Sequence, residues 1–184
     1  MVEKQTGIAT FAGGCFWCTE AIFKRLKGVI SVIPGYSGGK RSNPTYDQIH
    51  SGATGHAESI QIKFDPIIIS YEKLLEVFFA THDPTTLNRQ DYDVGTEYRS
   101  VIFYHTNKQR ELALVAKKKL EKSGFIKDPI VTEIVPYQAF YKAEEVHQNY
   151  YERNRSSSYC RIITDPKIQK LMKNFNEDVK EEYT

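Results

Sequence analysis

The stretch from residue 8 to residue 28 constrains the fold of this chain more than any other part of its sequence. Residues 8–12 are a short apolar run typical of a β-strand, and two glycines at 13–14 allow a sharp turn after it. Apolar side chains then recur at the i, i+4, i+8 spacing of a buried helix face: Cys18, Ile22 and Leu26. Gly28 can end such a helix. The pattern predicts a strand that runs directly into a helix, with Cys15 in the first helical turn.

The rest of the chain continues to alternate between strand-like and helix-like patterns. Strands are expected at residues 29–33, 59–64, 101–104 and 130–135, and helices at residues 44–49, 71–79, 107–123, 143–153 and 166–175. Residues 34–39 and 82–98 are expected to be loops, and a loop as long as the second is often functional. The alternation predicts an α+β fold, a two-layer sandwich of one mixed sheet with helices packed on it.

Length and composition indicate one ordinary globular domain spanning residues 1–184. Of the 184 residues, 40% are hydrophobic and 26% are charged, so the chain can bury a core without disulfides. We expect a core over about residues 6–153 and an irregular C-terminal tail over about residues 154–184 that ends in a short helix. A formal charge of +2 is too small to indicate nucleic-acid binding. No signal pattern or membrane-spanning apolar run is present, so we expect a cytoplasmic protein, and we expect a monomer.

The three cysteines form an odd number, which in a cytoplasmic protein indicates redox or catalytic use rather than a disulfide framework. A helix start favours an anion, so we expect it to lower the pKa of the Cys15 thiol and make a nucleophile. Taken alone, a cysteine is more often a small buried hydrophobe. As a Cys-x-x-Cys pair, Cys15 and Cys18 fit a redox dithiol, half of a zinc site, or a catalytic cysteine with an incidental neighbour. The five histidines are scattered without metal-ligand spacing, so we expect no metal.

Five motifs occur in order along the chain. They are Gly14-Cys15-Phe16-Trp17 followed by Glu20, Gly55-His56-Ala57-Glu58, Asp83-Pro84-Thr85-Thr86, Asp93 with Gly95-Thr96-Glu97-Tyr98-Arg99-Ser100, and Ala143-Glu144-Glu145-Val146-His147-Gln148. With these motifs the chain resembles the peptide methionine sulfoxide reductases of the A class from about residue 8 to residue 167. The resemblance implies a ferredoxin-like core and reduction of methionine-S-sulfoxide, free or in oxidised proteins, as a repair reaction. It also implies thioredoxin as the reductant and no cofactor.

The resemblance further implies roles for particular residues. Cys15 is the nucleophile, and Glu58 is the acid that protonates the sulfoxide oxygen. Phe16 and Trp17 form the wall around the substrate methyl group, and three more residues bind the sulfoxide oxygen directly or through water: Tyr46, Asp93 and Tyr98. A carboxyl enclosed by aromatic rings has a raised pKa, as an acid working at neutral pH requires. Without the motif, Glu58 at the start of a strand would be assigned to the surface.

The thiol that resolves the Cys15 sulfenic acid is the point where the chain departs from the usual family pattern. Condensation with a second thiol gives a disulfide, and the family commonly supplies that thiol from the C-terminal tail, where Cys160 matches. Position 18, however, is cysteine where most members carry glycine. We expect Cys160 to resolve, because a serine-flanked segment can move, whereas Cys18 is held in a helix and must satisfy strict disulfide geometry. Cys18 is the alternative.

Two other functions fit parts of the same pattern. A thioredoxin-like dithiol oxidoreductase would use Cys15 and Cys18 alone, and would need neither Glu58 nor Cys160. A redox-sensing or peptide-binding module would hold a methionine side chain in the aromatic cup without turning it over, so its binding would survive the change of Cys15 to serine.

Overall fold

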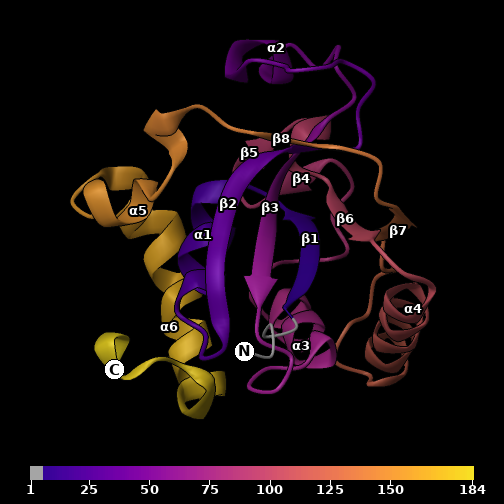
Figure 1. Cartoon of the computed structure of the whole chain (residues 1–184), viewed down its shortest axis with the longest axis vertical. Helices are drawn as coiled ribbons and strands as arrows, with labels where there is room; N and C mark the ends of the chain where they lie inside the picture. The colour runs from indigo at the N-terminus through magenta and orange to yellow at the C-terminus, as the bar shows by residue number, and fades with distance from the viewer. Residues whose placement is uncertain (1–5) are drawn as a thin grey trace, which may run out of the picture.

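The computed structural model describes residues 6–184, in which a six-stranded sheet is covered by helices (Figure 1). The strand order is β7-β6-β1-β3-β2-β8. The strands are β1 (Gly7–Gly13), β2 (Val29–Ser37), β3 (Ala57–Phe64), β6 (Ser100–Tyr104), β7 (Glu133–Pro136) and β8 (Phe140–Lys142). Neighbouring strands are antiparallel except β6 and β7, which are parallel. The predicted α+β fold with a mixed sheet is confirmed, and the ferredoxin-like description of its core stays a prediction.

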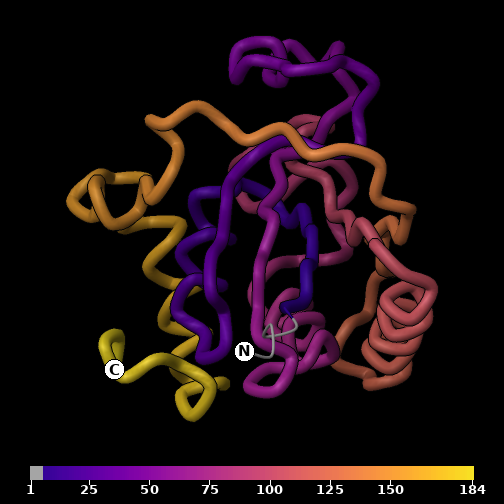
Figure 2. The backbone as a smooth tube through the Cα atoms, viewed as in Figure 1, coloured from indigo at the N-terminus to yellow at the C-terminus, as the bar shows by residue number. Residues whose placement is uncertain are grey.

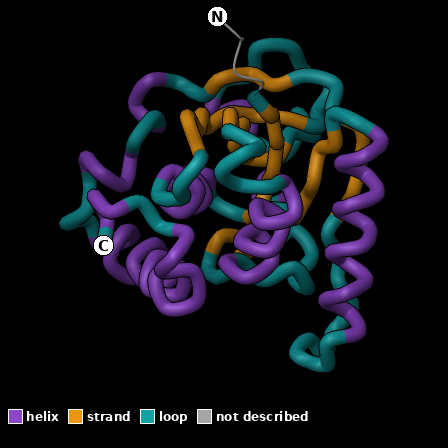
Figure 3. Tube along the Cα trace, turned by 60° about the horizontal axis from the view of Figure 1, so that its bottom comes forward, coloured by secondary structure: helices purple, strands orange, loops and turns teal. Residues whose placement is uncertain are grey.

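The longer helices are α1 (Phe16–Lys24), α3 (Tyr71–Thr81), α4 (Asn107–Lys122) and α6 (Asp165–Phe175). Most of the helical segments lie on one side of the strands (Figure 3). Ser70 and Thr106 cap α3 and α4 as predicted, because each side-chain oxygen accepts the backbone N–H three residues later. Short elements complete the chain: α2 (Tyr46–His50), α5 (Tyr150–Arg153), β4 (Arg89–Gln90), β5 (Asp93–Val94) and turns of 3-10 helix at Thr96–Tyr98, Glu145–His147, Asn176–Asp178 and Glu181–Tyr183.

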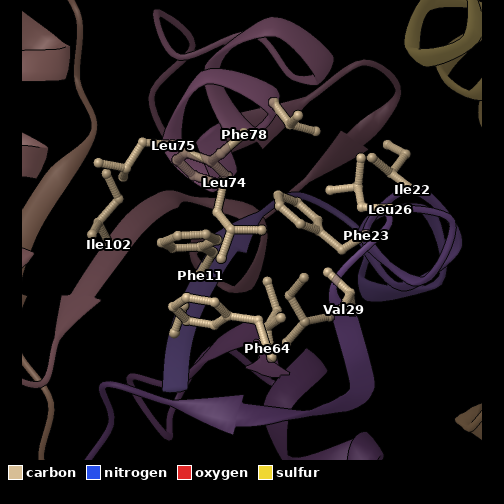
Figure 4. Close-up of a cluster of buried hydrophobic side chains, with 14 of the residues drawn as sticks. Phe11, Ile22, Phe23, Leu26, Val29, Phe64, Leu74, Leu75, Phe78 and Ile102 are labelled. Carbon is tan, nitrogen blue, oxygen red and sulfur yellow. The ribbon is translucent and has the colours of Figure 1, made fainter. Parts of the chain in front are cut away.

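The main core lies where β1, α1 and α3 meet (Figure 4). Phe11 on β1 is fully buried, and its ring centroid is 5.7 Å from that of Phe23 on α1 and 5.0 Å from that of Phe78 on α3. Burial of each side chain of this size contributes about 1.5–3 kcal/mol to the free energy of unfolding, relative to leaving the side chain exposed. The packing fixes α1 against the strand that precedes it, so the junction between β1 and α1 is held rigidly.

The glycine-rich residues 34–39 form the predicted loop only from residue 38 onward, because residues 34–37 belong to β2. β2 continues through Ser37, and its last residues pair with β8 as well as with β3. At Gly35 a Cβ atom would lie 2.4 Å from the carbonyl oxygen of Tyr141, so glycine is needed for the close approach of β8. The prediction was wrong for residues 34–37 because β8, which the sequence analysis missed, is a tertiary partner without a local signal of its own.

The helix expected at residues 143–153 is also wrong. Its place is taken by the 3-10 turn Glu145–His147 and the short helix α5, separated by Asn149 in the left-handed conformation with φ of 55°. The break is stabilised by α1, because Glu20 accepts the backbone N–H of Asn149 at 2.9 Å and Lys24 donates to its side chain at 2.6 Å. Tertiary hydrogen bonds override the helical pattern here.

The C-terminal tail is more regular than predicted. The segment before it, from β7 through β8 to α5, crosses the end of the sheet from the side of α4 to the side of α1, and α6 follows on that side (Figure 2). A π-helical turn at Cys160–Thr164 runs directly into α6, so the cysteine lies within a continuous helical segment and not in an irregular one. Within residues 6–184, no helix has the length and apolar character needed to cross a membrane.

Candidate active site

The turn from β1 into α1 places Cys15 at the N-cap of α1, with Gly14 before it at a φ of +87°. A Cβ atom at position 14 would lie 2.5 Å from the side chain of Gln90, so glycine fits this turn both in conformation and in space. The carbonyl of Cys15 accepts the N–H groups of Cys18 at 3.1 Å and Thr19 at 3.3 Å. The Phe16 N–H donates instead to Oε2 of Glu58 at 2.9 Å. The first helical turn therefore directs a donor to the Glu58 carboxyl.

The expected lowering of the Cys15 pKa is wrong for the reduced protein. Cys15 is only 5% exposed, and burial, together with the hydrogen bond and charge of Cys18, raises the pKa of its thiol well above the ordinary value. The hydrogen bond from Cys15 is the largest effect on Cys18 and lowers its pKa to about 7. Burial, the next largest, raises that pKa, and Lys167 and Thr164 add smaller lowering effects. Thr164 Oγ1 lies 3.2 Å from Sγ of Cys18. The hydrogen bond from Cys15 and the nearby Lys167 therefore favour the thiolate form of Cys18.

Glu58 is buried in β3 and is only 2% exposed, so its assignment to the surface from local pattern alone would be wrong. Burial raises the pKa of its carboxyl well above the usual value, and the nearby Asp93 and Glu97 raise it further. The bond from the Phe16 N–H acts in the opposite direction but is the smaller effect. The direction is the one that the resemblance implies, because a raised pKa favours the protonated form of the carboxyl.

An aromatic group surrounds the start of α1. The ring of Phe16 is fully buried, and its centroid lies 6.5 Å from those of both Trp17 and Tyr46. Trp17 stacks on Tyr150 with a centroid distance of 3.7 Å and donates from Nε1 to Nδ1 of His147 at 3.2 Å. The structure thus brings together the two predicted wall residues and one predicted oxygen-binding residue.

Glu144 in the last motif holds α2 in place. One of its carboxylate oxygens accepts the N–H of Tyr46 at 2.7 Å, and the other accepts the hydroxyl of Tyr36 at 2.8 Å. Thr45 and Gln48 add a reciprocal capping box at the start of the helix. These bonds fix the backbone from which Tyr46 projects, because they satisfy the donors at the N-terminus of α2.

Asp93 and Tyr98 belong to the same site. Asp93 accepts the hydroxyl of Tyr159 at 2.6 Å, and both Tyr98 and Tyr159 pack against the buried cluster of Cys15, Cys18 and Ile163. Burial, reinforced by the charge of Glu58, raises the pKa of Tyr46 and of Tyr98. Both hydroxyls therefore remain protonated at neutral pH and are available as hydrogen-bond donors.

The sequence profile of the peptide methionine sulfoxide reductase family matches residues 7–179. The chain belongs to this family. A peptide methionine sulfoxide reductase from Sulfolobus acidocaldarius is 54% identical over 168 residues, which cover 91% of this chain and 94% of that protein. Reduced Mxr1 from Saccharomyces cerevisiae has a similar structure, with a TM-score of 0.76 and 34% identity, covering 86% of this chain and 91% of Mxr1. Mxr1 in complex with Trx2 matches with a TM-score of 0.53 and 29% identity, covering 80% and 86%.

The third cysteine of this methionine sulfoxide reductase is held apart from the other two. Cys160 is fully buried in the π-helical turn, and its N–H donates to Oγ of Ser157 at 3.2 Å. Among the described residues, the cluster around Cys15 contains Cys18 but not Cys160. The structure therefore places the alternative resolving thiol, and not the preferred one, in contact with Cys15.

Several residues that line this site escaped the sequence analysis: His50, His147, Tyr150, Tyr159, Thr164 and Lys167. Of these, only His147 lies in a motif, and no periodicity or spacing distinguishes the others. Lys167, paired with Asp91 at 2.7 Å, approaches Cys18 only because α6 packs beside α1. Within residues 6–184 no three metal-ligating side chains gather to form a metal site.

Proposed function

We propose that this chain reduces methionine-S-sulfoxide, free or within proteins, to methionine, and that thioredoxin restores its thiols. The observation that carries the proposal is the hydrogen bond from the Phe16 N–H, which holds the buried carboxyl of Glu58, with its raised pKa, beside the Cys15 thiol. Membership of the family and the likeness to Mxr1 in complex with Trx2 support both the reaction and the reductant. The S epimer is the expectation from the resemblance.

In the first step the Cys15 sulfur attacks the sulfoxide sulfur, and its proton passes along the hydrogen bond to the Cys18 thiolate. Glu58 gives its proton to the sulfoxide oxygen, which transfers to Cys15. The products are methionine, a Cys15 sulfenic acid, a Cys18 thiol and a Glu58 carboxylate. Phe16 and Trp17 enclose the substrate methyl group, while Tyr46, Asp93 and Tyr98 bind the oxygen.

In the second step we propose that Cys18 condenses first with the sulfenic acid, releasing water and forming a disulfide with Cys15. Cys18 already contacts Cys15, and its N–H bonds to the Cys15 carbonyl as in a turn, in which residues i and i+3 lie within about 7 Å. That spacing suits a disulfide without backbone movement. Direct resolution by Cys160 stays a prediction and would require the π-helical turn to unwind. The dithiol of thioredoxin then becomes a disulfide as it returns both thiols.

The first test is turnover of the separate S and R epimers of a methionine sulfoxide substrate with dithiothreitol. We expect reduction of the S epimer only, no activity in Cys15→Ser, and a rate about 10²–10⁴-fold lower in Glu58→Gln, because the amide cannot donate the proton as an acid. Failure of the wild type on both epimers would refute the proposed reaction. The dithiol rival instead predicts reduction of insulin disulfides that does not depend on Glu58.

The second test maps disulfides by mass spectrometry after one equivalent of sulfoxide, without reductant. We expect a peptide that joins Cys15 to Cys18 in the wild type and, unchanged, in Cys160→Ser. In Cys18→Ser we expect the sulfenic acid to accumulate and to be trapped by dimedone. A Cys15–Cys160 peptide that appears first in the wild type would overturn the assignment of Cys18 and restore the tail cysteine.

Three wider expectations accompany the proposal. The reaction serves the repair of oxidised proteins, the protein acts in the cytoplasm, and it acts as a monomer. Cell fractionation tests the location, and sedimentation of the purified protein tests the oligomeric state.

A further inference from the structure

His50, the last residue of α2, lies between two buried carboxyl groups. Its Nε2 is 3.6 Å from Oε1 of Glu58, and its Nδ1 is 3.5 Å from Oε1 of Glu97. Both ring nitrogens are buried, and neither has a hydrogen-bond partner among the described residues. The side chain as a whole is 25% exposed, whereas that of Glu58 is 1% exposed. His50 therefore connects the buried acid to the edge of the site.

The proposed reaction requires a supply of protons to this place. Each turnover takes one proton from Glu58, and the carboxylate must regain it before the next sulfoxide reacts. Oε2 of Glu58 already accepts the N–H of Phe16 at 2.9 Å, and a backbone amide cannot deliver a proton. The other oxygen, Oε1, faces His50. An imidazole can accept a proton at one nitrogen while it releases one from the other.

We propose that His50 is the proton relay of Glu58, carrying a proton from the Glu97 side and solvent to Oε1 after each turnover. The inference rests on the proposed function of Glu58 as the acid. The transfer balances simply: imidazolium and Glu58 carboxylate become neutral imidazole and carboxylic acid, and solvent returns the proton to the ring. His50 does not touch the reacting atoms, so it acts only through Glu58.

The surroundings of His50 favour this role over simple packing. Its ring meets Tyr46 edge to face at a centroid distance of 4.0 Å and lies 5.8 Å from the ring of Tyr98. These contacts orient the ring without using its nitrogens. Titratable groups from five elements face or act on His50. They are Tyr46 of α2, Glu58 of β3, Asp93 of β5, Glu97 and Tyr98 of the 3-10 turn Thr96–Tyr98, and His147 of the 3-10 turn Glu145–His147. The two carboxyls lie 3.5 Å and 3.6 Å from opposite nitrogens of the ring, so a small movement of the side chain would complete a path from one to the other.

The experiment compares wild type with His50→Gln, which keeps a polar side chain but cannot titrate. The first turnover, measured as methionine formed without reductant, uses the proton already on Glu58, so we expect it to stay within about twofold. Steady-state kcat at saturating dithiothreitol should fall by about tenfold or more, because each later turnover waits for the proton. Added imidazole should restore kcat. An intact first turnover also demonstrates that the variant is folded.

The control is His105→Gln, which should leave both measurements unchanged. His105 forms a hydrogen bond with Thr10 at 2.9 Å and directly follows β6. Ser100 at the start of β6 pairs with Gly13 beside the site, so His105 lies at the opposite end of that strand. Three results would overturn the relay: an unchanged kcat in His50→Gln, a first turnover that falls in parallel with kcat, or a fall in kcat that imidazole does not restore. A wild type without sulfoxide reductase activity would instead refute the proposed function itself.

Discussion

Glu58 and Cys15 illustrate how the chemistry of single residues in this protein depends on their neighbours. A helix start usually stabilises a thiolate, but here the Phe16 N–H serves the Glu58 carboxyl and two further N–H groups serve the Cys15 carbonyl. The negative charge is therefore stabilised on Cys18, one turn later, beside Lys167. Sequence motifs pointed to Glu58 and Cys15, whereas the protonation of these two residues depends on their burial, which a motif does not encode.

Glu20 is a second buried carboxyl whose protonation we expect to affect stability. It is 4% exposed, and burial raises its pKa from the usual 4.5 to about 7. Between these pH values the folded state binds more protons than the unfolded state, so the free energy of unfolding falls as pH rises. The shift corresponds to about 3 kcal/mol, all of it lost above about pH 7.

Glu20→Gln should remove this dependence while keeping an oxygen that accepts the Asn149 N–H. Urea denaturation at about pH 4 and about pH 8 provides the measurement. From about pH 4 to about pH 8 the wild type should lose up to about 3 kcal/mol of its free energy of unfolding through this group, whereas the variant should not. The difference between variant and wild type should therefore shift in favour of the variant by that amount. A constant difference between variant and wild type at both pH values would contradict the shift.

At the scale of elements, the C-terminal helix has the largest effect on the site. The π-helical turn supplies Thr164 and Ile163 to the cysteine cluster, and α6 supplies Lys167. The sequence predicted the helix from residue 166 but not its extension back through Cys160. A π-helical turn has no distinct sequence signature, and its position follows from packing of the turn against α1 and of α6 against α1 and α3.

Leu171 anchors this helix and is fully buried. Because truncation removes apolar contacts and leaves a cavity, Leu171→Ala should lower the free energy of unfolding by about 2–5 kcal/mol. Ile162→Ala, at a position that is 63% exposed, is the matched control and should change it by less than about 0.5 kcal/mol. Urea denaturation followed by circular dichroism tests both variants. Equal losses in the two would show that α6 is not anchored through Leu171.

At the scale of the whole molecule, the sheet brings distant motifs to one end. β1 and β3 pair antiparallel, so the end of β1 before Cys15 lies beside the start of β3 that carries Glu58. The segment between β7 and α5 crosses that end (Figure 2), and Glu144 in this segment accepts the backbone N–H of Tyr46 in α2. That residues 1–184 act as one domain stays a prediction. The denaturation experiments also test it, since one domain should unfold in a single cooperative transition.

The sequence by itself determined the α+β class, the strand that leads into the helix at Cys15, the helix caps at Ser70 and Thr106, and the family. These features depend on local periodicity, on capping chemistry and on ordered motifs, all of which are written along the chain. Tertiary structure alone decided the end of β2 at Ser37, the break at Asn149, the contact of Cys18 rather than Cys160 with Cys15, and the place of His50 between two carboxyls. Each of these depends on groups far apart in sequence, whose approach changes backbone pairing and charge stability in ways that no local pattern encodes.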